Sequence, residues 1–393
     1  MEILVWIFWI AIGVIFYTYI GYGIILYGFV FLKERFGAKQ ECELKEGDLP
    51  ELTLLIAAYN ESSIIDAKME NCQSLRYPSG KLSILWVTDG SNDATNELLK
   101  QYPDIQICFS PERKGKTAAL NHGMQKVCTE LTAFTDANTM LNENALIEIA
   151  ACFRQKNVGC VAGEKRILTS DKDGASTGGE GLYWKYESKL KELDSRLYSA
   201  VGAAGELFAI RTALYEPMPE DTLLDDFVLS LHIAEKGYRI AYCKEAYACE
   251  KGSADLMNEH KRKVRIAAGG IQSICRLKVL LNPLRYGILS FQYVSHRVLR
   301  WTITPVLFFA IYPLNLILMF VQGGWFYILL FVLQTLFYIM AAVGACFQNK
   351  QFRFKILFVP LYFIFMNLNV LQAVPYLMRN KGKGSWDKAR RKE

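Results

Sequence analysis

Acidic and amide side chains follow two of the apolar runs in the first half of the chain. Asp89 stands in V-T-D-G-S-N-D, and Asp136 and Asn138 stand in T-D-A-N-T, at the end of each run. Asp89 is suited to hydrogen bonding a ribose or base, and the later pair could share Mg²⁺ or Mn²⁺ with a diphosphate, because hard cations prefer oxygen ligands. Such residues also cap helices and close turns. Capping is the preferred role for Asp93, which immediately precedes a helical run.

A basic turn and an acidic pair complete the set of residues that could carry chemistry. In R-K-G-K, residues 113–116, Gly115 would let the backbone approach a ligand, and Lys116 opens a helix whose N-terminus favours phosphate. The turn lacks the spacing of a P-loop. Asp225 and Asp226 open a later helix, where two acids either favour the N-terminus or supply a general base for an acceptor hydroxyl. Neighbouring negative charge and burial would raise the pKa of such a base.

These residues are positioned by an alternation of short β-rich runs and helical segments. Such alternation is typical of an α/β fold with a mostly parallel, Rossmann-like sheet, in which ligands bind at the carboxyl ends of the strands. Strands are predicted at 52–57, 82–88, 105–109 and 131–135, and helices at 62–75, 93–101, 116–127 and 143–153. Beyond residue 166 the pattern is less regular, with a Gly-rich loop predicted at 173–181 and a helix at 182–198.

Apolar residues make up 52% of the chain and are concentrated near its two ends. Residues 3–32 carry no charged side chain, and this run is longer than the roughly 20 residues needed to cross a bilayer. A secretory signal peptide is disfavoured because Glu2 precedes the run and Lys33 and Arg35 follow it. The positive-inside rule places the N-terminus outside and residues 33 onward in the cytoplasm, which predicts a multi-pass protein of the cell membrane.

The C-terminal third contains further candidate membrane spans, at 301–321, 325–347 and 356–378. Three basic residues between 350 and 355 mark a cytoplasmic loop, so a third crossing would put the basic tail outside, against the charge rule. The last segment is therefore either re-entrant, or it crosses the membrane and the tail is an exception to the charge rule. A crossing is slightly preferred. The tail has seven Lys/Arg against two acids, which suits contact with anionic membrane lipids. The central domain lacks the stripe of alternating aromatic and basic residues that would indicate nucleic-acid binding. The predicted units are a span at 1–35, an α/β domain at 48–255, interfacial helices at 256–298, two or three spans at 299–378 and the tail at 379–393.

The motifs, taken in order, resemble the family 2 glycosyltransferases, inverting enzymes of the GT-A fold that include cellulose, chitin, hyaluronan and poly-N-acetylglucosamine synthases. The resemblance covers about residues 50–275 and fits the membrane-bound branch of that family. It implies a nucleotide-sugar donor, preferably a UDP-sugar, that binds with Mg²⁺ or Mn²⁺ and reacts with a lipid-linked or saccharide acceptor.

The resemblance also assigns roles to individual residues. The D-x-D metal motif of the family matches Asp136-Ala137-Asn138, where Asn138 offers an oxygen without a charge, so lower metal affinity is expected. The catalytic E-D pair of the family falls on Asp225 and Asp226, with Asp226 as the base. Donor binding is assigned to Ala57, Tyr59, Glu61, Asp89, Lys116, Asp136 and Arg265, and the acceptor side to Gly205, Glu206 and Lys263.

One family motif is altered. Processive synthases carry Q-x-x-R-W near the membrane, where the Trp stacks on the acceptor sugar, and the aligned stretch here is R-K-V-R-I at 262–266. Arg265 remains to hold the diphosphate, but the Gln and Trp are missing, which favours limited transfer over long-chain synthesis. The predicted function is an inverting glycosyltransferase of envelope, capsule or exopolysaccharide biosynthesis. The alternatives are a processive polysaccharide synthase, a noncatalytic nucleotide-sugar-binding membrane subunit and, more distantly, a GT-A-like nucleotidyltransferase.

Overall fold

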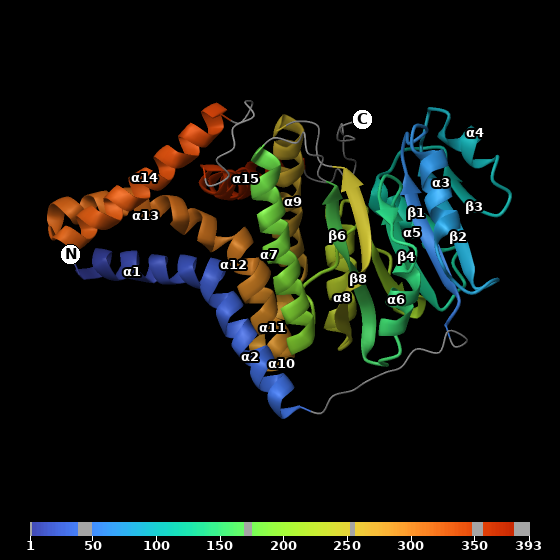
Figure 1. Cartoon of the computed structure of the whole chain (residues 1–393), viewed down its shortest axis with the longest axis horizontal. Coiled ribbons are helices and arrows are strands. Elements are labelled where there is room, and N and C mark those ends of the chain that lie inside the picture. The colour runs from blue at the N-terminus through green and yellow to red at the C-terminus, as the bar shows by residue number, and fades with distance from the viewer. Residues whose placement is uncertain (1, 38–48, 169–174, 252–255, 348–356, 381–393) are drawn as a thin grey trace.

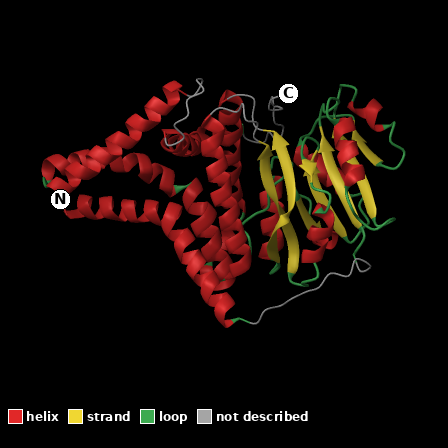
Figure 2. Cartoon of the chain, viewed as in Figure 1, coloured by secondary structure: helices red, strands yellow, loops and turns green. Residues whose placement is uncertain are grey.

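The computed structural model describes residues 2–37, 49–168, 175–251, 256–347 and 357–380. All the strands within these ranges lie in one part of the molecule, together with the helices that cover them. The other part consists of long helices, as Figure 2 shows. This division matches the separation of apolar ends and mixed centre in the sequence.

One eight-stranded sheet forms the α/β part, with strand order β3-β2-β1-β4-β7-β6-β8-β5. Its first half is parallel and contains β1 (Leu52–Ala58), β2 (Leu82–Asp89), β3 (Gln106–Ser110) and β4 (Leu131–Asp136). The second half is mixed and contains β5 (Met140–Leu141), β6 (Val158–Leu168), β7 (Phe208–Arg211) and β8 (Arg239–Lys251). The predicted α/β class is confirmed, with a parallel sheet where the strands were predicted.

Helices cover both faces of this sheet, which explains why strand β1 is apolar at every position except Thr53. Leu55 belongs to a core cluster with residues of α5 and α8, whereas Leu54 and Ile56 belong to a second cluster with residues of α3 and α6. Successive side chains of a strand point to opposite faces, so both sets must be apolar. The helices are α3 (Ile65–Ser74), α4 (Thr95–Leu99), α5 (Lys116–Met124), α6 (Ala145–Cys152), α8 (Asp225–Glu235) and the short η3 (Thr212–Leu214).

The predicted Gly-rich loop is wrong over the part that the structure describes. Helix α7 (Ala175–Leu197) begins seven residues before the predicted helix start at 182, and residues 173 and 174 lie outside the described residues. Glycine weakens a helix by about 1 kcal/mol relative to alanine, but tertiary packing overrides such propensities. Here α7 packs against α2 (Tyr22–Phe36), β8 and α15 (Phe358–Arg379), which supply that packing.

Four helical segments are long and apolar enough to cross a membrane: Glu2–Phe36, Ile303–Val321, Trp325–Cys346 and Val359–Arg379. They comprise α1 (Glu2–Phe16) with α2, then α13 (Ile303–Val321), α14 (Trp325–Phe347) and α15. The first segment bends at a π-helical turn, η1 (Tyr17–Gly21), after which α2 runs along α7 (Figure 1). In Figure 1, α1, α13 and α14 run across the picture, whereas α15 is seen nearly end-on.

A further long helix, α9 (Leu256–Arg276), joins the sheet domain to the apolar helices. It packs against α15, and His260 hydrogen-bonds Asn369 of that helix at 2.6 Å. Short helices then lead from α9 to α13: η4 (Lys278–Leu281), α10 (Pro283–Tyr286), α11 (Ile288–Tyr293), η5 (Val294–Val298) and α12 (Leu299–Trp301). The helices predicted at 256–298 are therefore present, and their position on a membrane surface stays a prediction.

Candidate active site

The predicted donor-binding residues gather at the carboxyl ends of β1, β2 and β4. Ala57 lies between Val87 and Asp136 in the sheet, since β1 pairs with β2 on one side and with β4 on the other. Asp89 ends β2, one position beyond the residue that pairs with Ala58. The register of the parallel strands thus brings these three motifs to one edge, as ligand sites in α/β sheets require.

Asp89 holds the basic turn that follows β3. Its carboxylate accepts hydrogen bonds from the backbone N–H groups of Lys114 (2.9 Å) and Gly115 (2.7 Å), and its side chain is buried. Gly90 has a φ of 64°, and a Cβ placed there would lie 2.6 Å from the backbone nitrogen of Arg113. Only glycine fits this close approach, so the D-G pair fixes the turn that carries Lys116.

The loop after β1 is tied to the segments that follow β2 and β3. The N–H of Glu61 donates to Thr95 Oγ1 (2.9 Å), and the guanidinium of Arg113 lies 3.9 Å from the centre of the Tyr59 ring. Asp93 accepts from the N–H of Thr95 (3.0 Å), at the start of α4, and from the N–H of Ser62 (3.2 Å) in the loop after β1, so it also joins the two loops. Burial would raise the pKa of Asp93, but hydrogen bonds from this and neighbouring groups outweigh it and lower the pKa.

Lys116 lies at the centre of the acidic site. Its ammonium is 2.8 Å from Asp136 Oδ1 and 3.5 Å from Asp225 Oδ2. A Cβ on Gly205 would lie 3.2 Å from Lys116 Nζ and 3.5 Å from Asp226 Oδ2, so this glycine leaves room for both groups. Burial would lower the pKa of Lys116, but the three carboxylates outweigh it and raise the pKa.

Asp226 is the second acid of the pair at the start of α8. It lies in the first turn of α8, beside Asp225 and near Glu206. Burial and the charge of Asp225 raise the pKa of Asp226 to about 7, although Lys116 acts in the opposite direction. A base is most effective when its pKa is near the working pH, so this environment suits proton abstraction at neutral pH.

The metal assignment can be tested on the oxygen atoms that follow β4. Asn138 Oδ1 is buried, and no described residue provides it with a hydrogen-bond partner. The carboxylate of Asp136, two residues earlier, is only partly buried. These two oxygens fit Mg²⁺ or Mn²⁺, which are held by one or two protein oxygens together with substrate phosphates. Within the described ranges no group of three or more His, Cys, Asp or Glu side chains could hold a metal, so phosphate oxygens would be needed.

Helix α9 carries two of the predicted basic residues, Arg265 and Lys263. Burial lowers the pKa of Arg265, while Tyr376, Asp225 and Asp136 act in the opposite direction. Lys263 pairs with Glu259 (3.4 Å) and lies 5.2 to 6.0 Å from three aromatic rings. These rings belong to Tyr183, Trp184 and Tyr362.

Three residues near the site, Lys165, Glu250 and Lys68, were not found from the sequence. Lys165 pairs with Glu250 and with the predicted acceptor-side residue Glu206; burial would raise the pKa of Glu206, but Lys165 lowers it to about 2. Lys68 is fully buried and donates to Thr139 O (2.5 Å), in the loop that follows Asp136 and Asn138. In the sequence, Lys68 could have been noticed only because it stands among the apolar residues Ile65, Met69 and Cys72 on one face of a helix.

A clamp on α9 holds the turn that leads to the acidic pair. Gln272 accepts from the N–H of Leu223 (3.0 Å) and donates to Asp221 O (2.9 Å). Arg276 donates to Asp221 Oδ1 and to Thr222 Oγ1, both at 2.7 Å. Residues 221–223 are thus fixed by four hydrogen bonds from one helix, immediately before Asp225 begins α8.

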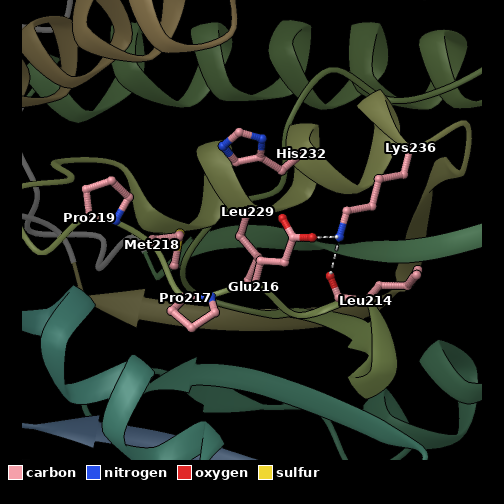
Figure 3. A pocket seen from close by; sticks show the side chains of 8 residues that line it. All are labelled: Leu214, Glu216, Pro217, Met218, Pro219, Leu229, His232 and Lys236. Carbon is pink, nitrogen blue, oxygen red and sulfur yellow. Dashed lines mark hydrogen bonds and ion pairs between the residues drawn. The ribbon is translucent and has the colours of Figure 1, made fainter.

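The pocket drawn in Figure 3 is a different place. Leu229 and His232 of α8 and Lys236, just after that helix, line it, whereas Asp225 and Asp226 begin α8. Its volume of about 50 Å³ is far below the roughly 300 Å³ at which ligand clefts begin. It therefore carries no part of the proposed chemistry.

The eight-stranded mixed sheet and the oxygen-rich edge at its centre define a GT-A-type domain. The model of the family described as glycosyltransferase like family 2 matches residues 50–269, and the chain belongs to this family.

Two curated relatives match over almost two thirds of this chain. Poly-beta-1,6-N-acetyl-D-glucosamine synthase of Staphylococcus aureus (strain COL) is 27% identical over 259 residues, covering 63% of this chain and 61% of the relative. Beta-monoglucosyldiacylglycerol synthase of Trichormus variabilis is 27% identical over 266 residues, covering 64% of this chain and 54% of the relative. The matches thus span less than two thirds of the length of either relative.

A solved structure extends the similarity of fold to the apolar helices. The mannosyltransferase PcManGT from Pyrobaculum calidifontis, solved in complex with GDP-Man and Mn²⁺, aligns with a TM-score of 0.67. The alignment covers 95% of this chain and 99% of that one, at 19% sequence identity. The apolar helices are therefore part of the shared fold.

Proposed function

We propose that this protein is an inverting glycosyltransferase that moves a sugar from a nucleotide-sugar donor to an acceptor at a membrane. The observation that carries the proposal is the position of Asp226 at the start of α8, beside Lys116 and the ends of β1, β2 and β4, where burial and Asp225 raise the pKa of Asp226 to about 7. Family membership and the names of the relatives support the reaction class.

The reaction is a single displacement at the anomeric carbon. Asp226 accepts the proton of the acceptor hydroxyl while that oxygen forms a bond to the anomeric carbon. The bond from the anomeric carbon to the phosphate oxygen breaks, and the nucleoside diphosphate leaves with its electron pair. Attack from the face opposite the leaving group inverts the configuration, and Asp226 then releases its proton to solvent.

Cationic groups near the base stabilise the leaving diphosphate. Lys116 and Arg265 supply two fixed charges, because both lie within the electric field of Asp136 and Asp225. Asp136 and Asn138 would hold Mg²⁺ or Mn²⁺, which, when bound, neutralises charge on the diphosphate. Fixed charges in a buried site stabilise developing negative charge more than water does.

The proposed donor is a UDP-sugar, and the proposed acceptor is a lipid-linked or other saccharide. The site would face the cytoplasm, as the basic residues after the first apolar segment indicate. We further propose that α15 lies along the cytoplasmic membrane surface and does not cross the bilayer. Its orientation, different from α13 and α14 in Figure 1, and its buried Asn367 and Asn369 support this arrangement. The basic tail then stays inside, as the charge rule requires.

Asp226→Asn tests the assignment of the base. Purified protein would be incubated with labelled UDP-sugars, Mn²⁺ and lipid or saccharide acceptors, and both transfer and donor binding would be measured. The variant should lose transfer by more than about a thousandfold while it still binds donor. Near-normal transfer by this variant would remove Asp226 from the mechanism.

A second candidate is a processive polysaccharide synthase, which is favoured by the similarity to the poly-beta-1,6-N-acetyl-D-glucosamine synthase. Sizing of the products separates the two: one added sugar indicates limited transfer, and a ladder of lengths indicates polymerisation. A noncatalytic subunit would bind donor but give neither transfer nor donor hydrolysis across a panel of nucleotide sugars.

A further inference from the structure

The turn that carries the proposed metal ligands is closed by its own last residue. Thr139 donates to the carbonyl of Asp136 through both its backbone N–H (3.3 Å) and its hydroxyl (2.9 Å). Asn138 is the third residue of this turn, and no described residue provides its buried Oδ1 with a hydrogen-bond partner. Since Asp136 and Asn138 are the ligands that the protein would supply, the direction of their oxygens depends on the backbone of residues 136–139.

Helix α3 holds the end of this turn through three hydrogen bonds. The ammonium of Lys68 donates to the carbonyl of Thr139 (2.5 Å). One turn further along α3, the side-chain amide of Asn71 accepts from the N–H of Leu141 (2.9 Å) and donates to its carbonyl (2.8 Å). Side chains three positions apart lie on the same face of a helix, so Lys68 and Asn71 act together on residues 139–141.

The start of the turn is fixed independently of α3. Thr135, directly before Asp136, donates its hydroxyl to the carbonyl of Glu206 (2.8 Å), and Asp136 itself still belongs to β4. Asn138, by contrast, lies one residue before the carbonyl that Lys68 holds. A loss of the α3 contacts should therefore move the amide oxygen of Asn138 more than the carboxylate of Asp136.

Lys68 is an unusual residue for a purely structural contact. Its side chain is completely buried, although lysine is almost never fully buried unless it is paired. Among the described residues no carboxylate lies within ion-pair distance of its ammonium, and the carbonyl of Thr139 is its hydrogen-bond acceptor. Burying an ammonium without a counter-charge is costly, and a methionine would fill the same space without that cost. An apolar side chain would therefore serve the fold as well, and the ammonium needs another explanation.

We propose that Lys68, together with Asn71, is a positioning residue that sets the direction in which the metal ligands present their oxygens. This inference rests on the proposed function, in which Asp136 and Asn138 hold Mg²⁺ or Mn²⁺ on the donor diphosphate. Lys68 acts through the backbone at Thr139 and touches neither the ion nor the donor. Groups that orient metal ligands in this way change metal affinity by about 10- to 100-fold.

The test measures binding of Mn²⁺ to the full-length protein in detergent, with saturating UDP and, in a second series, saturating GDP. Free Mn²⁺ has a sharp electron paramagnetic resonance signal that broadens on binding, so the dissociation constant is read without turnover. Lys68→Met keeps the length of the side chain and removes its charge and its donor. Lys81→Met is the matched control, because Lys81 donates to the carbonyl of Leu49 (2.7 Å) at the amino end of β2, the edge of the sheet opposite the site.

Lys68→Met should weaken Mn²⁺ binding by about tenfold or more, because the ligand oxygens are no longer held in place. Binding of the nucleotide without metal should stay as in wild type, and Lys81→Met should change neither constant. Lys68→Met should unfold at the same or a higher temperature than wild type without metal, because it removes a buried charge. Asn71→Leu, which has a side chain of similar shape, removes the other two hydrogen bonds and should also weaken Mn²⁺ binding.

Unchanged Mn²⁺ binding in Lys68→Met would overturn the proposal, as would an equal loss in Lys81→Met. A lower unfolding temperature in Lys68→Met, together with weaker binding of the nucleotide alone, would mean that the lysine serves the fold and would also overturn it. Should Lys68→Met not fold, Asn71→Leu decides: unchanged Mn²⁺ binding overturns the proposal, and a loss of about tenfold supports it.

Failure of the proposed function would be a separate result. A wild type that binds Mn²⁺ with nucleotide but neither transfers nor hydrolyses any donor would refute the proposed function, and Lys68→Met would still test the positioning role. A wild type that does not bind Mn²⁺ with either nucleotide would overturn the positioning role, whatever its activity.

Discussion

The pKa of Asp226 leads to a quantitative prediction for the pH dependence of transfer. The base must be ionised to accept a proton, so activity should be lost as the pH falls through the folded-state pKa. With a pKa of about 7, roughly a tenth of Asp226 is ionised at pH 6 and nine tenths at pH 8, a gain of about tenfold in rate. An aspartate with its ordinary pKa near 4 would give no change over this range.

The assay is kcat/KM for the acceptor at saturating donor and Mn²⁺, between about pH 5.5 and 8.5. Asp225→Asn is the informative variant, because the charge of Asp225 is the second cause of the raised pKa, after burial. This variant should move the acidic limb of the profile to lower pH. Lys116→Met should move it to higher pH, because Lys116 lowers the pKa of Asp226. A wild-type profile that is flat over this range would refute the assignment of Asp226 as the titrating base.

Three further predictions concern the metal, the fold and the membrane. Asn138→Asp should lower the Mn²⁺ concentration for half-maximal activity by about tenfold, because it adds a charge at the second metal ligand; an unchanged value would argue against metal binding there. Gly90→Ala should lower the free energy of unfolding by about 2 kcal/mol, measured in detergent, and by more than Gly80→Ala, where φ is also positive but nothing lies within 4 Å of a Cβ. A cysteine introduced at Gln322 should react with a membrane-impermeant maleimide in intact cells, whereas one introduced at Asn380 should react only after permeabilisation. Reaction of both in intact cells would mean that α15 crosses the membrane.

The sequence was most informative where one local rule governs both structure and chemistry. The residues that end β1, β2 and β4 were predicted to share a site, and their parallel register brings Ala57 and Asp136 side by side. That prediction needed only the apolar runs and the polar residues after them. The acidic pair was also recognisable, because Asp225 and Asp226 open the amphipathic helix α8.

Contacts between distant parts of the chain could not be predicted in this way. Lys165 joins Glu206 to Glu250 across the second half of the sheet. The positions of these three residues in the sequence give no sign that their side chains are in contact. The same holds for Lys68 and Thr139, 71 positions apart in the chain, which meet because α3 packs against β5. Such features depend on which surfaces pack together, and packing is not encoded in local periodicity.

The clamp from α9 shows why the site cannot be separated from the membrane part of the chain. A domain boundary at residue 255 would exclude Gln272 and Arg276, although both hold the turn at 221–223 that precedes Asp225. The helix that carries them also packs against α15. The turn that precedes the proposed base is therefore held by α9, a helix that packs against the apolar helix α15.

Gln272→Ala tests this coupling. The variant loses the hydrogen bonds to Leu223 and Asp221, so the base should be less well positioned while the donor site is intact. A misplacement of about 1 Å can cost on the order of a hundredfold in rate, so kcat should fall by about 10- to 100-fold with little change in donor KM. Gln272→Glu keeps an oxygen to accept from Leu223 and should lose less. Wild-type kcat in Gln272→Ala would show that α8 alone positions Asp226, and the link from membrane helices to base would then have no catalytic role.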